Sequence, residues 1–380
     1  MGILKCRLLY LVGQLRPGGL ERQLYLLLQG MDRRQYRPAV VVWGICEDDV
    51  YGSEIRGLGV PLHYLPAGTS RAAKLRSLRR MVKHMQPEVL HSYSFHTNVA
   101  AWWGALSTDT IPIGAVRSDF ALDRKESGPF LGRLSARWPY HQISNNFLAA
   151  RTVRQSRSFF VPRRLSIVRN GVDLHSFFMS PLSTKGPARI AGVGALFPVK
   201  RWDRLLHAAL NLKKKGLDFH VEIAGGGHLH ESLEQQTRDL SLDHRVRFAG
   251  HTVDISGLLA RSTFLAHTSD NEGCPNVIME AMACGRAVVA TDAGDIPSLV
   301  DDGKTGFVVP RGDDTALVDR LEKLIVGRDL CKRMGEAGRA KAEREFGVDR
   351  LVSDTLAVYR AAGWEDAQPV VAEPFVLYHR

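Results

Sequence analysis

Two glutamates, Glu272 and Glu280, are separated by seven residues in the segment DNEGCPNVIMEAMACGRAVVAT (270–291). Glu272 lies in a stretch that reads as a loop. Pro275 suits the first turn of a helix, because its fixed φ angle and missing N–H cost nothing there. From Asn276 onward the residues follow a helical pattern. The segment therefore predicts a loop-to-helix junction with one carboxylate on each side of it.

Such a junction has a defined chemistry. The first turn of a helix presents backbone N–H groups and the positive end of the helix dipole, which suit a phosphate. Glu280, about one turn into the helix, can accept hydrogen bonds from two ribose hydroxyls. Glu272 can reach the hydroxyls of a sugar beyond the phosphates. The segment can thus hold a sugar, a diphosphate and a ribose in order, although an ordinary buried helix with two incidental acids remains an alternative.

Two further segments each lie just after a predicted strand. One is rich in glycine, and the other contains histidines. GQLRPGGLERQ (13–23) lies between the first predicted strand and the first predicted helix, where glycines permit close backbone approach to an anion. HSYSFHTN (91–98) follows the fourth predicted strand. A lone histidine is often a satisfied core residue, and a glycine-rich turn is often only a turn.

Apolar runs alternate with helical patterns such as 20–31 and 71–85, which predicts parallel strands buried on both faces of a sheet. In the first half the predicted strands are LLYLV (8–12), AVVVW (39–43), VPLHYL (60–65), EVLHSY (88–93), IPIGAV (111–116) and LSIVRN (165–170). In the second half they are ARIAGVGA (188–195), FHVEIAG (219–225), VRFAG (246–250), FLAHTS (264–269), RAVVAT (286–291) and TGFVVP (305–310).

The predicted fold class is α/β, with two doubly wound domains, since 380 residues are too many for one ordinary domain. The polar stretch 180–189 reads as a linker between a first domain, 1–179, and a second, 187–346. A helix at about 347–363 is expected to cross back to the first domain. Ligands bind beyond the carboxyl ends of parallel strands, so we expect a cleft between the two domains.

The net excess of positive charge is confined to the first half of the chain. Met1 to His175 holds 25 Lys and Arg against 12 Asp and Glu, whereas the remainder holds 26 against 28. This asymmetry favours an anionic partner for the first domain, either a bilayer surface or a phosphorylated lipid acceptor, although a merely solvated basic surface remains an alternative. We expect no nucleic acid. The basic helix 71–85 has an apolar stripe of Leu75, Leu78 and Val82, which either lies on a membrane or packs on the sheet.

Cysteine usage and the lack of a signal peptide predict a reduced, cytoplasmic protein, and its basic character favours a peripheral position at the inner face of the cell membrane. The five cysteines are scattered without CxxC spacing, which supports neither a disulfide framework nor a zinc site. No long apolar window predicts a transmembrane helix. The apolar run from Met1 to Gly13 lacks the small-residue cleavage site of a signal peptide.

The segment 270–291 resembles the E-x7-E signature of family 4 glycosyltransferases, EG-aromatic-P-N-V-x-x-EAMA-x-G-x-P-V-VAT, and the likeness continues to about residue 313. Cys274 replaces the common aromatic residue, and neither carboxylate is changed. The resemblance implies the GT-B fold of two Rossmann-like domains. It also implies that Glu272 is catalytic, and that the donor is bound by a set of neighbouring residues: Gly273, Cys274, Pro275, Asn276, Val277 and Glu280.

Two other segments are similar to family motifs. In GVGALFPVKRWDRLLHA (192–208), Lys200 matches the lysine that neutralises the donor diphosphate, while Ala195 stands where the family has arginine. Diphosphate stabilisation then falls to Lys200, assisted by Arg201 or by an arginine of the first domain. Gly18 and Gly19 match the glycines of the family's first-domain loop.

The histidine motif after the fourth predicted strand is also similar to that of the family. His91, His96 and Asn98 match it, and Tyr93 replaces the middle histidine. The resemblance implies that His96 is catalytic.

The resemblance further implies a retaining hexosyltransferase that uses a UDP- or GDP-linked sugar as substrate and needs no cofactor. EDD (47–49) is not D-x-D, so we expect no metal. The expected acceptor is a saccharide or lipid-linked molecule of bacterial cell-surface polysaccharide or glycolipid synthesis. Three alternatives remain open: a nucleotide-sugar epimerase of the same fold, a nucleotide-sugar-binding protein without turnover, and a dinucleotide oxidoreductase. The last fits poorly, because AGGGHLHESL (224–233) is not a full GxGxxG.

Overall fold

The computed structural model describes residues 6–117, 119–183, 185–251, 254–365 and 378–379, and the chain divides into two compact units. Unit 1 holds Met1–Gly171 and Val348–Arg380, and unit 2 holds Val172–Gly347. The boundary thus precedes the predicted end of the first domain at 179. Val172 forms a parallel bridge with Gly347 and donates to the carbonyl oxygen of Phe346 at 2.7 Å, which ties this segment to unit 2.

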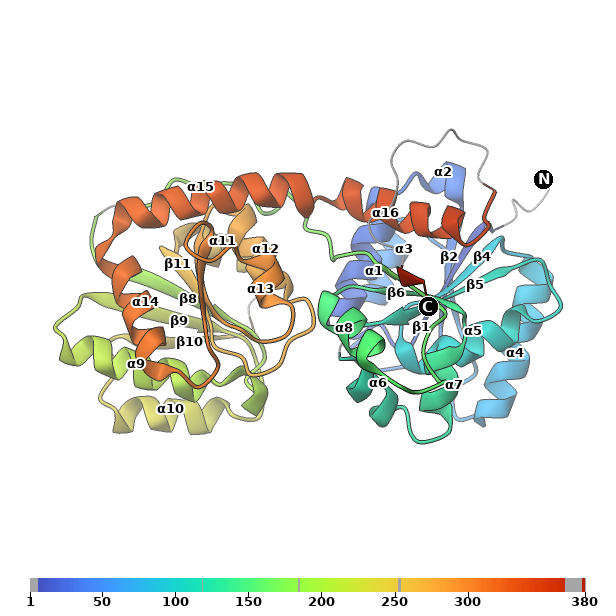
Figure 1. The fold of residues 1–380 in the computed structure, drawn as a ribbon, viewed down its shortest axis with the longest axis horizontal. Coiled ribbons are helices and arrows are strands. Elements are labelled where there is room, and N and C mark those ends of the chain that lie inside the picture. Colours follow the sequence, from blue (N-terminus) through green and yellow to red (C-terminus); the bar gives the residue numbers. More distant parts are fainter. Residues whose placement is uncertain (1–5, 118, 184, 252–253, 366–377, 380) are drawn as a thin grey trace. The chain divides into compact units, whose positions relative to one another are not determined.

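Unit 1 is built on one sheet with the strand order β14-β7-β6-β5-β4-β1-β2-β3, in which only β14 is antiparallel to its neighbour (Figure 1). The strands are β1 Leu8–Val12, β2 Pro38–Val42, β3 Leu62–Tyr64, β4 Val89–Ser92, β5 Ile111–Val116, β6 His141–Ser144, β7 Arg164–Ile167 and β14 Tyr378–His379. The helices are α1 Gly19–Gly30, α2 Arg33–Tyr36, α3 Val50–Gly57, α4 Arg71–Met85, η1 Phe95–Thr97, α5 Asn98–Ala105, α6 Phe120–Glu126, α7 Leu131–Arg137, α8 Phe147–Gln155 and α16 Val348–Ala361.

The first strand shows why the sheet needs helices on both faces. Leu8, Tyr10 and Val12 pack into the core under α1 and α16, whereas Leu9 and Leu11 pack into the core under α4 and α5. All five side chains are buried. This burial confirms the prediction of a parallel sheet covered on both faces.

Strand β6 was not predicted, because its side chains do not form an apolar run. His141, Gln142 and Ser144 are nevertheless buried. A ring nitrogen of His141 lies 2.9 Å from the hydroxyl of Ser166 on β7, and Gln142 Nε2 donates to the carbonyl oxygen of Ser135 at 2.9 Å. Internal hydrogen bonds offset the cost of burying these polar groups, so hydropathy does not reveal the strand.

Helix α4 is the basic helix predicted at 71–85, and its apolar stripe packs on the sheet. Leu78 and Val82 are fully buried, and the cluster that holds them includes Leu9 and Leu11 of β1. The exposed side of the helix carries Arg76 and other basic residues. The stripe is therefore part of the core of unit 1.

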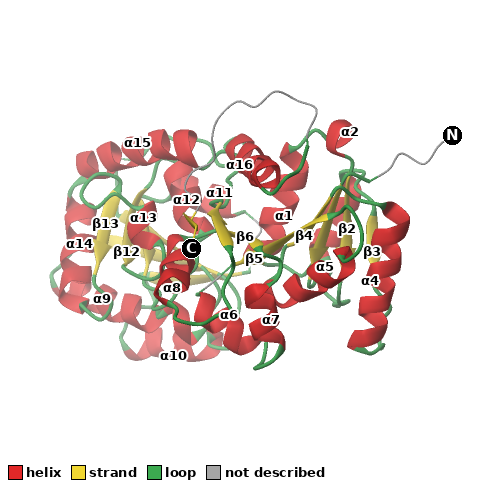
Figure 2. Ribbon diagram, turned by 45° about the vertical axis from the view of Figure 1, so that its right-hand side comes forward, coloured by secondary structure: helices red, strands yellow, loops and turns green. Residues whose placement is uncertain are grey.

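Unit 2 has a wholly parallel sheet with the strand order β10-β9-β8-β11-β12-β13. The strands are β8 Ala188–Val193, β9 Phe219–Ala224, β10 Val246–Gly250, β11 Phe264–His267, β12 Ala287–Thr291 and β13 Gly306–Val309. The helices are η2 Pro198–Lys200, α9 Trp202–Lys214, α10 His230–Asp239, α11 Ile255–Arg261, α12 Asn276–Ala283, α13 Ile296–Leu299, α14 Asp314–Val326 and α15 Arg328–Glu345. Figure 2 shows this sheet between helices, and separate cores lie on its two faces.

The last helix, α16, returns to unit 1, where the sequence predicts a crossover at about 347–363. Leu351 and Leu356 share a buried cluster with Leu24 and Leu27 of α1. Among the described residues, no helix has both the length and the hydropathy needed to span a bilayer. The first five residues of the apolar run at the start of the chain lie outside the described residues.

The packing of α4 gives a test by mutation. Leu78→Ala should lower the free energy of unfolding by about 2–5 kcal/mol, because it leaves a cavity in the core. Arg76→Ala, on the exposed side of the same helix, should change it by less than about 0.5 kcal/mol. Urea unfolding followed by circular dichroism measures both values, and equal effects would contradict burial of the stripe.

Candidate functional site

The predicted loop-to-helix junction lies in unit 2, directly after β11. Helix α12 begins at Asn276, as predicted, with Pro275 as the residue that precedes its first turn. Ile278 and Met282 are fully buried, so the apolar face of the helix fixes its position on the sheet. Because the strands are parallel, the loop before α12 lies at the carboxyl edge of the sheet, where ligands of such folds bind.

The carboxylate of Glu272 in this loop binds two side chains from other elements. Its Oε1 accepts from Lys200 Nζ, at the end of η2, at 2.5 Å and from His267 Nε2, at the end of β11, at 2.8 Å. The His267 side chain is 1% exposed, against 10% for Glu272 and 21% for Lys200. Both contacts use one oxygen, and no hydrogen bond from the described residues reaches Oε2.

These neighbours set the charge of Glu272. Burial alone raises the pKa of a carboxyl group, but the charges and hydrogen bonds of His267 and Lys200 outweigh it and hold the pKa of Glu272 at about 2. Glu272 is therefore ionised at neutral pH. It presents a negatively charged hydrogen-bond acceptor.

Arg201, expected as a helper at the diphosphate, is instead paired with two carboxylates. Its guanidinium lies 3.0 Å from Asp203 Oδ2 and 2.8 Å from Asp270 Oδ2. Hydrogen bonds to Asp203 and Asp270 raise the pKa of Arg201 above its ordinary value. Asp270 also binds Arg204 at 3.0 Å. Arg201 thus stabilises the loop before Glu272, and Lys200 is the lysine that the structure brings to the carboxylate.

The loops after β8 and β9 also lie at this edge and require glycine. A Cβ atom added at Gly225, which has a φ of +154°, lies 1.9 Å from the carbonyl oxygen of Gly194. Ala195, in place of the family arginine, accepts a hydrogen bond from Trp202 Nε1 on its carbonyl oxygen at 3.0 Å. The two loops therefore pack backbone against backbone, and Ala195 supplies no cation.

The remaining predicted donor residues lie along the same segment. Cys274 and Val277 are each 8% exposed, and Gly273 accepts a backbone hydrogen bond from Asp295 at 3.2 Å. Glu280 is on α12 with 2% exposure.

In unit 1 the structure brings together His96 and the glycine-rich loop after β1. A Cβ atom at Gly13 lies 2.6 Å from His96 Cε1, so the ring packs closely on the loop that continues to Gly18 and Gly19. Burial against this loop, with the charge of Arg71, lowers the pKa of His96 and keeps its ring neutral at pH 7. These residues lie at the carboxyl edge of the unit 1 sheet.

The other histidine-motif residues have structural roles. His91 is 2% exposed, and its Nδ1 lies 2.7 Å from the hydroxyl of Tyr359. Tyr93 is 2% exposed under the guanidinium of Arg117, which lies 3.9 Å from the ring centroid. Asn98 is fully buried and donates to the carbonyl oxygen of Ala115 at 2.9 Å. None of the three presents its side chain to solvent.

His267 is the residue of this site that sequence reasoning missed. It ends the observed strand β11, but it lies inside the predicted strand 264–269, whereas His96 follows its predicted strand. It was overlooked because it belongs to an apolar run, FLAH, and reads as part of the core. Its Nδ1 is buried and has no hydrogen-bond partner among the described residues.

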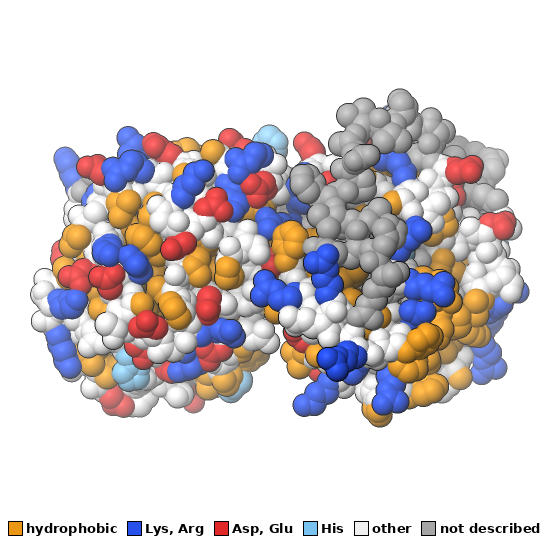
Figure 3. Space-filling view, in the orientation of Figure 1, with side chains coloured by type: hydrophobic (Ala, Val, Ile, Leu, Met, Phe, Trp, Pro, Cys, Tyr) orange, Lys and Arg blue, Asp and Glu red, His pale blue; other side chains and the backbone are white. Residues whose placement is uncertain are grey.

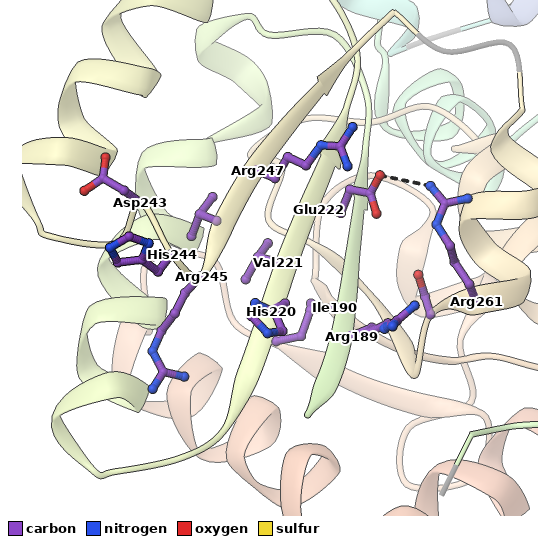
Figure 4. A pocket seen from close by; sticks show the side chains of 12 residues that line it. Arg189, Ile190, His220, Val221, Glu222, Asp243, His244, Arg245, Arg247 and Arg261 are labelled. Atoms are coloured by element: carbon purple, nitrogen blue, oxygen red, sulfur yellow. Dashed lines mark hydrogen bonds and ion pairs between the residues drawn. The ribbon is translucent and has the colours of Figure 1, made fainter. Parts of the chain in front are cut away.

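A separate groove of about 590 Å³ crosses β8, β9 and β10 near their amino ends (Figure 4). Arg189, His220 and Arg247 line it on adjacent strands, and Glu222 accepts from Arg261 at 2.9 Å. No predicted site residue lines this groove. The candidate site is therefore the carboxyl edge around Glu272. Among the described residues, no group of three or more His, Cys, Asp or Glu side chains is placed to hold a metal ion.

Comparison with known proteins identifies family matches in both units. The family model described as "Glycosyl transferase 4-like domain" matches residues 18–171, and "Glycosyl transferases group 1" matches residues 177–341. The second match includes the whole Lys200 and Glu272 site. Together the two matches cover most of the chain.

Curated relatives align over part of their length. N-acetyl-alpha-D-glucosaminyl L-malate synthase of Bacillus anthracis is 30% identical over 143 residues, which is 38% of this chain and 38% of that protein. The amylovoran biosynthesis glycosyltransferase AmsK of Erwinia amylovora is 29% identical over 192 residues, which is 48% of this chain and 47% of that protein. The aligned region thus spans less than half of each relative.

Among solved structures, Anabaena Alr3699/HepE in complex with UDP has a TM-score of 0.79 and 19% identity, covering 93% of this chain and all of that one. The same protein has also been solved with UDP-glucose, at a TM-score of 0.77. At this identity the likeness establishes the fold.

The environment of Glu272 predicts a change in acid stability. Because its pKa falls from 4.5 to about 2 on folding, ionised Glu272 stabilises the folded state above pH 4.5, and this contribution is lost as the pH falls towards 2. On acidification, the free energy of unfolding of Glu272→Gln should fall by on the order of 1–3 kcal/mol less than that of the wild type. Chemical denaturation between pH 5 and pH 2.5 measures the slope. The exposed control Glu231→Gln should keep the wild-type slope, and a wild-type slope in Glu272→Gln would contradict the assignment.

Proposed function

The chain belongs to the family 4 glycosyltransferases, which have the GT-B fold, and we propose that it transfers a hexosyl group from a nucleoside diphosphate sugar to an acceptor hydroxyl. We further propose that the reaction retains the anomeric configuration and needs no metal or other cofactor. The observation that carries the proposal is the ionised carboxylate of Glu272, held by Lys200 and His267 at the start of α12.

Each donor-binding residue has a proposed role. Lys200 and the first backbone amides of α12 neutralise the diphosphate, because a cation and a helix N-terminus both favour negative charge. Glu272 accepts a hydrogen bond from the sugar, and Glu280 accepts from the ribose. Gly273 to Val277 line the diphosphate. In unit 1, His96 and the turn at Gly18 and Gly19 contact the substrates.

The proposed reaction uses no protein nucleophile. The acceptor oxygen forms a bond to the anomeric carbon on the face from which the diphosphate departs, the bond from that carbon to the phosphate oxygen breaks, and the acceptor proton passes to the departing phosphate. The protein then contributes positioning and charge stabilisation. Lys200 must release Glu272 at least partly when the diphosphate arrives, while His267 keeps the carboxylate in place.

The donor and acceptor are proposed from relatives and from charge. HepE binds UDP and UDP-glucose, which favours a UDP-sugar here, with a GDP-sugar as the second candidate. AmsK is named for amylovoran biosynthesis, which favours an acceptor of bacterial cell-surface polysaccharide or glycolipid synthesis. We propose that the enzyme works in the cytoplasm, peripherally on an anionic membrane that carries this acceptor.

Donor identity is tested first. UDP-, GDP- and ADP-sugars are compared by thermal shift, and a ligand present at 100 times its Kd should stabilise the protein by about 2.7 kcal/mol. With the donor known, release of the nucleoside diphosphate is followed with and without acceptor extract. Release that requires acceptor supports the transferase, whereas sugar isomerisation without acceptor favours an epimerase. Binding with neither reaction favours a protein without turnover.

Lys200 is tested by removing its charge. Lys200→Ala should lower kcat about 100-fold or more, because the diphosphate loses its cation in the transition state. The matched control Lys214→Ala, exposed on α9, should keep wild-type turnover. Near-normal turnover in Lys200→Ala would remove Lys200 from the site.

Glu280 is tested by the balance between KM and kcat. Glu280→Ala should raise the donor KM about tenfold or more with a smaller change in kcat, because the ribose contact is made in both the ground state and the transition state. Steady-state kinetics at saturating acceptor give both constants. An unchanged donor KM would mean that the ribose binds elsewhere.

A further inference from the structure

Unit 1 contains a long stretch without any carboxylate side chain. Residues 127–172 include eight arginines, no lysine and no aspartate or glutamate. A guanidinium stays charged at physiological pH and can bind a phosphate through two parallel hydrogen bonds. The positive charge of this stretch is therefore not neutralised from within it.

Aromatic rings from this stretch and from α5 form a connected series. The rings of Trp102 and Trp138 lie 5.2 Å apart, and those of Trp138 and Tyr140 lie 6.2 Å apart. The guanidinium of Arg137 lies 5.5 Å from the Tyr140 ring and 4.5 Å from the Phe159 ring. Cations on ring faces hold the aromatic side chains in place.

The series reaches solvent at its outer members. Tyr140 is 45% exposed and Phe159 is 68% exposed, while Arg163 is exposed with its guanidinium 4.6 Å from the Tyr140 ring. The arginine–aromatic surface is defined by five residues: Trp102, Trp138, Tyr140, Phe159 and Arg163. Figure 3 shows hydrophobic side chains gathered beside Lys and Arg over the part of unit 1 where Figure 1 labels α5 and α7.

This surface lies at the amino edge of the unit 1 sheet. Trp102 is in the second half of α5, before β5 begins, Tyr140 directly precedes β6, and Arg163 directly precedes β7. His96 follows β4 and so lies at the opposite, carboxyl edge. A partner that covers the arginine–aromatic surface therefore leaves the His96 loop uncovered.

Helix α4 is a weaker candidate for a membrane contact. Its apolar residues Leu78 and Val82 are buried in the core, and its exposed residues are basic apart from Ala72. Electrostatic attraction alone is lost at high salt. The arginine–aromatic surface adds exposed rings to the charge, which is the combination found at bilayer interfaces.

We propose that the arginine–aromatic surface docks on the headgroup layer of an anionic lipid bilayer. This inference rests on the proposed function, because it names the face through which such an enzyme meets the membrane of its acceptor. Arginines bind lipid phosphates, and the tryptophan and tyrosine rings enter the interfacial layer.

The full-length protein is sedimented with vesicles of phosphatidylcholine alone and of phosphatidylcholine mixed with phosphatidylglycerol. The wild type should bind the mixed vesicles and release them at high salt. The variant Tyr140→Ser/Phe159→Ser/Arg163→Glu should bind at least about tenfold more weakly. Brominated lipids in the mixed vesicles should quench the tryptophan fluorescence of the wild type, because Trp102 and Trp138 belong to the surface.

Two controls separate this surface from others. Arg76→Glu/Arg80→Glu/Lys83→Glu changes three charges on α4, and Phe178→Ser removes an equally exposed ring in unit 2, at 57% exposure. Both should keep most vesicle binding. Donor binding by thermal shift should be unchanged in the surface variant, which separates a failed membrane contact from a failed transferase assignment.

Several results would overturn the proposal: no preference for phosphatidylglycerol in the wild type, loss of binding in the α4 variant only, or a surface variant that changes oligomeric state but not vesicle binding. The last result would indicate a protein interface instead. If the surface variant does not fold, the contact is tested by whether brominated lipids quench the tryptophan fluorescence of the vesicle-bound wild type. Unquenched tryptophans in vesicle-bound protein would refute the contact.

Discussion

The candidate site depends on one carboxylate with two donors. Glu272 Oε1 receives Lys200 at 2.5 Å and His267 at 2.8 Å, in a place where burial alone would favour a neutral acid. A buried charge persists only when it is paired and hydrogen-bonded. Because two donors bind the carboxylate, one of them can leave while the other remains hydrogen-bonded to it. Lys200, the more exposed of the two, can turn to an incoming diphosphate while His267, at 1% exposure, holds Glu272 in position.

The parallel sheet of unit 2 delivers these groups from separate parts of the chain. Lys200 follows β8, His267 ends β11, and Glu272 precedes α12, so all three reach the same edge only because their strands run in one direction. Close packing of the backbone fixes the loop. A Cβ atom at Gly294, which has a φ of +58°, lies 1.8 Å from the carbonyl oxygen of Glu272, so only glycine fits there. Arg201 pairs with Asp270 two residues before Glu272 and holds the other side of the loop.

Sequence patterns predicted the elements that depend on apolar runs and turns. The two-unit α/β fold, α4, α12 and the returning α16 follow from hydrophobic periodicity and from residues such as Pro275. Features built on buried polar contacts were not visible. Strand β6 was missed because the buried polar groups of Gln142 and its neighbours form hydrogen bonds inside unit 1. His267 was missed because it lies inside the predicted strand 264–269, and its contact with Glu272 is visible only in the structure. His91 matches a position of the family motif, and Tyr93 replaces the middle histidine of that motif. Both side chains are buried inside unit 1, and the spacing of the motif does not reveal this burial.

The central claim is that Glu272 recognises the sugar while Lys200 recognises the diphosphate. Calorimetric titration of Glu272→Gln with the free nucleoside diphosphate and with the matching sugar nucleotide separates these two contacts. We expect affinity for the sugar nucleotide to fall about tenfold or more, since a charged hydrogen bond is lost, while affinity for the free diphosphate changes less than about threefold. Equal losses for both ligands, or no loss for the sugar nucleotide, would contradict it.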